Sequence, residues 1–254
     1  MSGKTKIEWT EAAWNPITGC SPVSEGCEHC YAQRMAQRLA GRYGYPKAYP
    51  FAVTVHDDRM VEPLSWKKPR RIFVCSMADL MHDNVPDMAI RDVIGTIKAA
   101  PQHTFQILTK RPRRLEEWVW PSNVWLGVTA ENQQRADERI PILLTHQHAS
   151  VLFVSIEPML GPITLKRYIG DPMPRPWPVL VHADGGTPPR GLDWVICGAE
   201  TGPGARPMHN VWADDLYRQC KKASVPFFFK KQTEGLGVLE KVLACREIPG
   251  VESQ

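Results

Sequence analysis

The sequence lacks the features of an exported or membrane-spanning protein. Its first residues, 1–6, are mixed in character and do not form the apolar stretch of a signal peptide. No apolar run approaches the roughly 20 residues that span a bilayer. A large excess of charge is also lacking, because 31 basic and 27 acidic side chains leave a net charge of +4. We therefore expect a soluble, cytoplasmic protein with no membrane partner, whose charge permits contact with nucleic acid without demanding it.

An even set of cysteines is lacking as well. The chain has seven, and without an export signal a disulfide framework is disfavoured. Cys20, Cys27 and Cys30 stand close together as C-x6-C-x2-C, with no fourth cysteine nearby. A structural zinc ion takes four protein ligands, and a [4Fe–4S] cluster normally takes four cysteines. Three thiolates in one loop therefore favour a cluster with one iron left for a substrate or cofactor, with zinc as the alternative. Cys75 and Cys197 lie in apolar segments and are expected in the core.

The rest of the chain alternates short apolar strands with amphipathic helices. The predicted strands are 72–76, 105–109, 124–129, 151–156, 194–198 and 226–229. Helices are predicted directly after Cys30 and over about 86–101, 132–140 and 212–220. Nearly continuous apolar strands are typical of parallel sheets covered on both faces, and repeated strand–helix units imply right-handed crossovers. We predict an α/β fold, a partial (βα) TIM-like barrel of parallel strands with an N-terminal cluster-binding loop.

One domain is predicted over residues 1–254. The segment 165–192 is rich in proline and glycine and interrupts the pattern, which resumes at Trp194. It is therefore interpreted as an inserted loop rather than a linker. Residues 235–254 are interpreted as a C-terminal tail.

Polar residues follow each of the six predicted strands. In barrels the chemistry lies where the strands end, at the C-terminal rim. The rim residues are Ser76, Asp79, Lys110, Arg111, Thr129, Glu131, Glu157, Glu200, Lys230 and Lys231. One polar strand end means little, but six in succession predict a site. Because the cysteine loop belongs to the first strand–helix unit, we expect it at the same rim.

The loop over residues 15–32 has the form Asn-Pro-x-x-Gly-Cys, then Gly-Cys-x-x-Cys-Tyr-Ala. It resembles the radical S-adenosylmethionine enzymes, most closely the branch that contains the DNA-repair enzyme spore photoproduct lyase. The chain is also similar to a phage and bacterial family with a three-cysteine motif, on residues 73–81, 108–112 and 155–160. This second similarity implies an association with phages. The resemblance covers about residues 9–231, with one departure: the first gap between cysteines is six residues, where three is usual.

The resemblance implies a specific enzymatic chemistry. Cys20, Cys27 and Cys30 would hold three irons of a [4Fe–4S] cluster, and S-adenosylmethionine would chelate the fourth. An electron from a donor such as flavodoxin or ferredoxin would cleave the sulfonium to give a 5′-deoxyadenosyl radical. The cofactors carry this chemistry, and the protein supplies placement and a dry cavity.

The resemblance also assigns roles around the cofactor. Ser76, with Asp79 as a second candidate, would contact the methionine amino group. Lys110 would pair with the carboxylate, and Thr129 would bond the ribose or carboxylate. Tyr31, just after the cysteines, is placed near adenine. The residues expected to touch substrate are Glu157, Glu200 and Arg111, and no catalytic residue is assigned.

A nucleic-acid base or nucleotide, modified or repaired, is the expected substrate. Basic clusters at 67–71 and 110–114 suit phosphates, and nine tryptophans, including Trp118, Trp120 and Trp125, suit base stacking. The alternative to the enzyme is a non-enzymatic, zinc-stabilised nucleic-acid-binding module.

Overall fold

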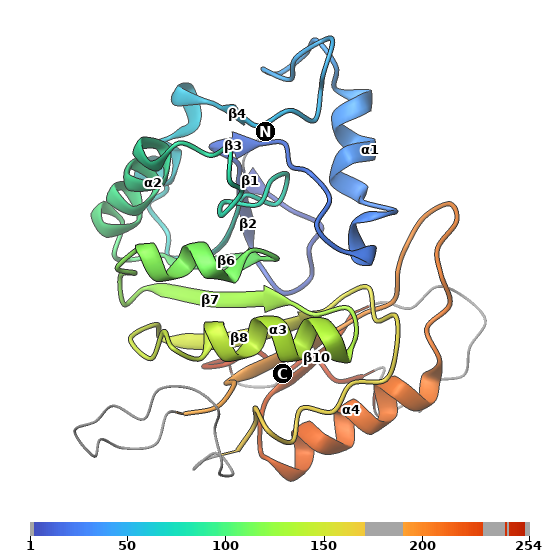
Figure 1. Ribbon diagram of the computed structural model, residues 1–254. Coiled ribbons are helices and arrows are strands. Elements are labelled where there is room, and N and C mark those ends of the chain that lie inside the picture. The colour runs from blue at the N-terminus through green and yellow to red at the C-terminus, as the bar shows by residue number, and fades with distance from the viewer. Residues whose placement is uncertain (1–2, 171–189, 231–241, 243, 252–254) are drawn as a thin grey trace. The chain divides into compact units, whose positions relative to one another are not determined.

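A computed structural model describes residues 3–170, 190–230, 242 and 244–251 (Figure 1). The chain forms two compact units, the first of residues 1–126 and 148–150, the second of residues 127–147 and 151–254. Strand β7 (Val124–Thr129) begins in the first unit and ends in the second. The predicted inserted loop and tail lie largely outside the described residues, and the prediction of a single domain stays a prediction.

Parallel strands form the centre of the first unit. Its sheet contains β1 (Gly3–Lys4), β2 (Ala12–Trp14), β5 (Arg71–Val74) and β6 (Thr104–Thr109). Strand β1 pairs antiparallel with β2, whereas β2 with β5 and β5 with β6 are parallel pairs. A separate antiparallel pair joins β3 (Ile17–Thr18) to β4 (Thr54–Val55). The helices are α1 (Tyr31–Arg38), α2 (Asp87–Ala99) and the short 3₁₀ turns η1 (Glu25–Cys27), η2 (Asp57–Arg59), η3 (Glu62–Ser65) and η4 (Pro112–Glu117).

Helix α2 is an amphipathic helix that contributes one apolar face to the core. Pro86 stands just before its first turn, and Ile90, Val93 and Ile97 are fully buried. Residues three and four positions apart share a helix face, so this spacing puts all three side chains on the core side. Their burial stabilises the unit by about 1.5–3 kcal/mol each.

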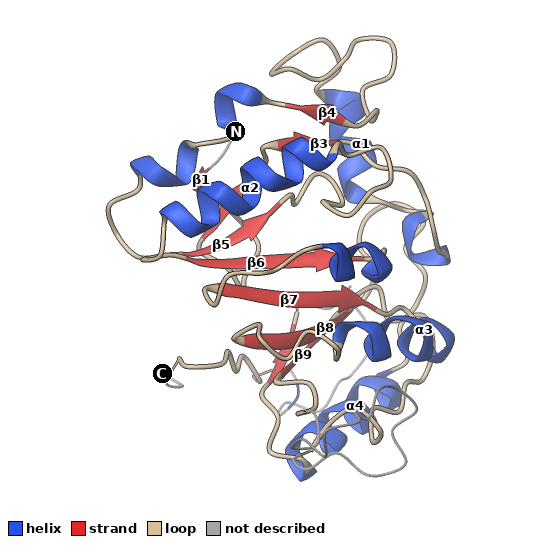
Figure 2. Cartoon of the chain, turned by 60° about the vertical axis from the view of Figure 1, so that its left-hand side comes forward, coloured by secondary structure: helices blue, strands red, loops and turns tan. Residues whose placement is uncertain are grey.

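The second unit repeats the parallel pattern. Strands β8 (Val151–Ile156), β9 (Trp194–Cys197) and β10 (Phe227–Phe229) pair in parallel, and all their residues are buried. Helix α3 (Gln133–Leu143) precedes β8 along the chain, and helix α4 (Asn210–Lys222) lies between β9 and β10 in sequence; both helices are labelled in Figure 2. The Asn132 side chain caps α3 by accepting the Arg135 N–H at 3.0 Å. The alternation of helices with parallel strands confirms the predicted α/β class.

The six predicted strands and four predicted helices are all present. Cys75 and Cys197 are buried, 3% and 0% exposed, as expected. Strands β1, β2, β3 and β4 were not predicted, since segments of two or three residues carry no readable period. Among helices in the described part of the chain, none is long and apolar enough to cross a membrane.

Helix α1 buries the small residues of its apolar pattern. Tyr31, Met35 and Leu39 repeat every four residues, with Ala32 and Ala36 beside them. Ala32 and Ala36 are buried, while Tyr31 is 51% and Met35 40% exposed. The small alanines let the helix backbone approach its neighbours, and the large side chains remain at the surface.

Candidate functional site

The cysteine loop starts at a glycine that no other residue can replace without strain. Gly19 has a φ of +91°, and a Cβ at this position would lie 2.1 Å from the carbonyl oxygen of Ala52. Its N–H donates to the Met77 carbonyl at 2.9 Å, and the Cys20 N–H donates to Phe51 at 3.1 Å. The loop is thus tied on one side to residues 51–52 and on the other to the segment that follows β5.

The three cysteines of the loop are free of disulfide bonds and partly buried. Cys27 ends η1, and its N–H donates to Ser24 at 2.9 Å. Cys30 stands just before α1, and its carbonyl accepts the Arg34 N–H at 3.3 Å. All three thiols therefore lie on short, hydrogen-bonded backbone at the surface of the first unit. The buried Cys75, by contrast, cannot reach solvent.

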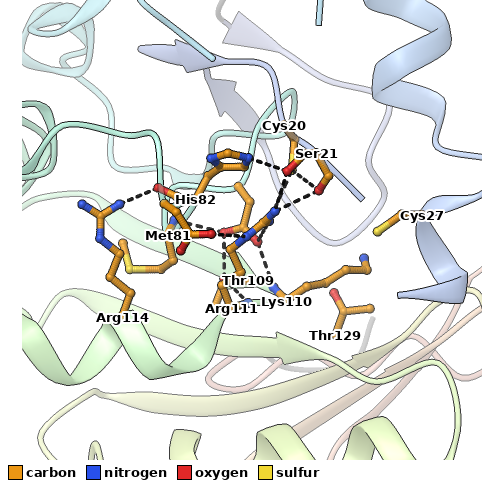
Figure 3. A network of polar contacts seen from close by, with 12 residues as sticks. Cys20, Ser21, Cys27, Met81, His82, Thr109, Lys110, Arg111, Arg114 and Thr129 are labelled. Atoms are coloured by element: carbon orange, nitrogen blue, oxygen red, sulfur yellow. Dashed lines mark hydrogen bonds and ion pairs between the residues drawn. The ribbon is translucent and has the colours of Figure 1, made fainter. Parts of the chain in front are cut away.

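Asp79 organises the strand ends behind the loop, where Figure 3 shows Thr109, Lys110 and Arg111 close together. Its carboxylate accepts the Thr109 hydroxyl at 2.7 Å and the Lys110 N–H at 3.0 Å, both at the end of β6. It also accepts the Met81 N–H at 3.0 Å and pairs with the Arg111 guanidinium at 3.4 Å. The residue is 7% exposed. The amino group of S-adenosylmethionine would have to share the Asp79 carboxylate with these four partners from the protein. The cofactor role of Asp79 therefore stays a prediction.

Two side chains from distant segments hold the start of the loop. The Arg111 guanidinium donates to Cys20 Sγ at 3.4 Å, to the Ser21 carbonyl at 2.9 Å and to its hydroxyl at 3.1 Å. His82 Nε2 lies 2.8 Å from the same hydroxyl, and its Nδ1 accepts the Asn84 N–H at 3.0 Å. Because burial lowers the pKa of His82, the ring is neutral and Nε2–H is the donor to Ser21.

The first thiol of the loop lies in a mixed electrostatic environment. Burial, followed by the Asp79 carboxylate, raises the pKa of Cys20 above its ordinary value. The Arg111 guanidinium acts in the opposite direction, by its charge and by its hydrogen bond. The Cys27 thiol also contributes, so these two sulfurs are near enough to interact electrostatically.

The donor set consists of thiols, which are ligands of both iron–sulfur clusters and zinc. Among the described residues, no three His, Cys, Asp or Glu side chains converge on a point suited to one metal ion. In a [4Fe–4S] cluster each cysteine binds a different iron, so the sulfurs need not converge. The three free thiols lie on one loop, and Gly19 lets the start of that loop pass close to the Ala52 backbone. This arrangement fits a [4Fe–4S] cluster.

Tyr31 and Ser76, both predicted to bind the cofactor, are in direct contact. The Tyr31 hydroxyl donates to the Ser76 carbonyl. The Ser76 hydroxyl and the Met77 N–H donate to Asn15 Oδ1, at 3.2 and 2.9 Å. Asn15 was not predicted as a site residue, although its place in the Asn-Pro motif was the available signal.

The backbone and the side chain of Lys110 have different surroundings at the end of β6. Its backbone N–H bonds Asp79, whereas its side chain extends away from this network in Figure 3. The structure thus brings Lys110, Asp79, Arg111 and Cys20 into one set of contacts within the first unit. Ser21, His82 and Thr109 complete this set and were missed, because hydroxyl and imidazole groups in loops carry no periodic signal.

Thr129 lies in the second unit, at the end of β7. It is 3% exposed, and its carbonyl accepts the Arg139 guanidinium at 2.7 Å. Arg139 also pairs with Glu131 at 3.0 Å, with side chains 5% and 0% exposed. This buried pair joins α3 to the end of β7 and fixes the backbone at Thr129.

Glu157 and Glu200, predicted to meet substrate, are both paired with cations in the second unit. Glu157 lies 2.6 Å from Lys230, and both side chains are about a quarter exposed, 26% and 23%. Glu200 is 5% exposed and forms two parallel bonds with Arg206, at 2.9 and 2.6 Å. Glu157 thus keeps an accessible edge, whereas Glu200 is held by its arginine.

Some of the predicted phosphate and stacking groups are engaged elsewhere. Arg114 donates to the Val85 carbonyl and to Asp87, each at 2.7 Å. Trp120 and Trp125 are buried, 6% and 8% exposed. The expectation that these two tryptophans form stacking platforms is therefore wrong, because they pack in the core.

A different surface combines aromatic and basic groups. Between residues 29 and 56 the sequence has no acidic residue, four Lys or Arg and four tyrosines. Tyr31, Tyr43 and Tyr49 are 51%, 59% and 78% exposed. Arg42 and Lys47 are exposed in the loop after α1 that also contains Tyr43 and Tyr49. We name these four residues the tyrosine surface.

A family model described as "Protein of unknown function (DUF5131)" matches residues 4–248. The chain belongs to this family. Among curated proteins, none matches the chain. The predicted link to the three-cysteine-motif family and to phages stays a prediction.

Solved structures of spore photoproduct lyase are similar in fold. The complex with dinucleoside spore photoproduct matches with a TM-score of 0.55 at 11% identity, over 92% of this chain and 79% of that one. A cysteine-to-alanine variant matches with a TM-score of 0.54 at 12% identity, over the same shares. A tyrosine-to-phenylalanine variant matches with a TM-score of 0.46 at 15% identity, and there this chain spans 48% of its length.

The likeness shows the fold and no more at this level of identity. The predicted partial TIM-like barrel of parallel strands is confirmed by this similarity to the fold of spore photoproduct lyase.

Proposed function

We propose that the protein is a radical S-adenosylmethionine enzyme. One observation carries this proposal: three free, partly buried cysteines lie on a glycine-anchored loop beside the strand ends of a fold similar to spore photoproduct lyase. Cys20, Cys27 and Cys30 would hold a [4Fe–4S] cluster. When bound, the cluster and S-adenosylmethionine would supply an electron and a 5′-deoxyadenosyl radical that abstracts hydrogen.

The residues around the loop would bind the cofactor. The contact between Tyr31 and Ser76 supports a joint role near the adenosyl and amino groups. Lys110 has a side chain directed away from the Asp79 network, which suits a carboxylate partner. Thr129 would bond the ribose or carboxylate. The electron donor would be a small redox protein such as flavodoxin or ferredoxin.

The substrate we propose is a nucleic-acid base or nucleotide, in modification or repair. A structure similar in fold was solved with dinucleoside spore photoproduct, which supports this class. The tyrosine surface offers exposed aromatic rings for stacking and cations for phosphates. Glu157, with its accessible edge, is the carboxylate we propose at the substrate.

The test is anaerobic reconstitution with iron and sulfide. We expect a brown protein that absorbs near ~400 nm, a property of iron–sulfur centres that zinc lacks. With dithionite and S-adenosylmethionine it should release 5′-deoxyadenosine. Cys27→Ala should lose colour and product, whereas Cys220→Ala, which changes a buried cysteine outside the loop, should keep both. A colourless protein that holds one zinc and cleaves nothing would overturn the enzyme and favour the zinc-stabilised binding module.

A further inference from the structure

Arg111 makes contacts that its predicted role at the substrate does not explain. Its guanidinium spans two residues of the cysteine loop, with one nitrogen 3.4 Å from Cys20 Sγ and the other 2.9 Å from the Ser21 carbonyl. The second nitrogen also donates to the Ser21 hydroxyl at 3.1 Å. These residues are about ninety positions apart in sequence, so the contact joins the loop to the end of β6.

The arginine is itself held in place. The Asp79 carboxylate lies 3.4 Å from the nitrogen that faces Cys20, and the side chains of Arg111 and Asp79 are 10% and 9% exposed. The Arg111 backbone N–H also donates to the Thr109 hydroxyl at 2.8 Å, and that hydroxyl donates to Asp79 at 2.7 Å. A guanidinium fixed by this cycle of bonds cannot turn to solvent without breaking several of them. It is therefore preorganised toward the sulfur.

A cation with an N–H directed at a ligand sulfur has a defined effect on an iron–sulfur centre. Reduction adds negative charge to the cluster, and hydrogen bonds to the sulfurs and limited exposure to solvent set the reduction potential. Partners outside the first ligand shell also orient the ligands themselves. Arg111 would thus stabilise the reduced cluster and hold Cys20 in a single orientation.

We propose that Arg111 is a positioning residue that fixes Cys20 and raises the reduction potential of the cluster, rather than a substrate-binding residue. The inference rests on the proposed function, since it requires a cluster at the three cysteines. In this proposal, Asp79 and Thr109 hold the Arg111 guanidinium in place. Lysine at position 111 would keep the charge but not the planar fork that reaches Cys20 and Ser21 together.

The experiment compares reconstituted wild-type protein with Arg111→Gln, Arg111→Lys and the control Arg113→Gln, which removes an exposed charge two residues away. Redox titration with dithionite, without S-adenosylmethionine, measures the midpoint potential, and iron content and circular dichroism are measured on the same samples. We expect Arg111→Gln to lower the reduced-to-oxidised ratio at least tenfold at a fixed potential, a shift of about 59 mV for one electron. Arg111→Lys should shift less, and Arg113→Gln should not shift.

Each other outcome has a clear meaning. Loss of iron from folded Arg111→Gln, with a shifted potential in Arg111→Lys, supports the positioning role. An unchanged potential in both Arg111 variants overturns the inference and leaves the proposed function standing. An unchanged potential with weakened S-adenosylmethionine binding assigns Arg111 to the cofactor instead. A wild-type protein that takes no cluster overturns the proposed function and the inference together.

Discussion

Gly19 shows how one residue can determine whether the cysteine loop forms. Its positive φ is costly for any side chain, and its missing Cβ makes room for the Ala52 carbonyl. The Asn-Pro-x-x-Gly-Cys motif contains this glycine, but only the backbone geometry explains why a glycine is needed at this position.

Gly19→Ala should therefore disrupt the conformation of the cysteine loop more than the fold of the first unit. We expect the substitution to lower the free energy of unfolding by more than about 1 kcal/mol and to reduce the iron bound after reconstitution. Gly95→Ala is the control, because Gly95 lies in α2 and a Cβ added there would meet nothing within 4 Å. It should stabilise by up to about 1 kcal/mol and leave the iron content unchanged. Equal iron in both variants would contradict the role of Gly19.

His56 gives the first unit a dependence on pH. The ring is 6% exposed and bonded to the Thr18 hydroxyl at 2.8 Å, and burial, with help from Arg59, lowers its pKa to about 4. In the unfolded chain its pKa is near 6.5. The folded state therefore favours the neutral ring. This contribution is full above about pH 6.5 and is lost as the pH falls toward about 4.

His56→Asn should remove that part of the acid sensitivity. We expect wild-type protein to lose on the order of 2 kcal/mol more stability than the variant between about pH 7 and pH 4.5. Urea unfolding at both pH values measures the difference, in which the carboxylates shared by both proteins cancel. Equal losses in the free energy of unfolding of the two proteins would show that His56 is not buried in its neutral form.

At the scale of elements, long periodic segments were predictable and short ones were not. The spacing of Ile90, Val93 and Ile97 gave α2, and the apolar run over 151–156 gave β8. Strand β2 has three residues, and its place beside β5 depends on pairing that no local pattern reveals. In α1 the pattern predicted the helix, but it could not tell which of the apolar residues are buried.

Helix α3 depends on a buried ion pair that ties it to β7. Arg139→Ala would leave Glu131, which is fully buried, without its cation, and would release the Thr129 carbonyl. We expect a loss of about 3–5 kcal/mol in the free energy of unfolding. Arg135→Ala on the same helix breaks an exposed pair with Glu138 and should cost at most about 1 kcal/mol. Urea denaturation compares the two, and similar small losses would mean that the Arg139 pair is solvated.

At the scale of the whole molecule, the fold class and the cysteine loop could be predicted, but the network behind the loop could not. The positions of Asp79, Lys110 and Arg111 after predicted strands indicated that they are site residues. Which atoms they bond depends on side-chain directions set by the packed strands, so the contacts of Arg111 with Cys20 and Ser21 could not be predicted. The tyrosine surface was missed for a related reason: the sequence shows tyrosines, and only the structure shows which are exposed.

The tyrosine surface leads to a prediction for binding of single-stranded nucleic acid. Stacking on an aromatic side chain is worth about 1–3 kcal/mol per base, so Tyr43→Ala and Tyr49→Ala should each weaken binding about fivefold to a hundredfold. Met88→Ala, an exposed apolar side chain on α2, should leave affinity unchanged. Fluorescence anisotropy with a labelled oligonucleotide measures the affinities.

Salt dependence separates stacking from phosphate contact on the same surface. Each phosphate contact contributes about 0.7 to the slope of log affinity against log salt for single strands. Arg42→Gln should lower that slope by about 0.7, whereas Tyr49→Ala should weaken binding at every salt concentration and leave the slope as it is. If both tyrosine variants bind like wild type, the nucleic acid does not contact this surface, and a substrate at Glu157 would have to be recognised by other residues.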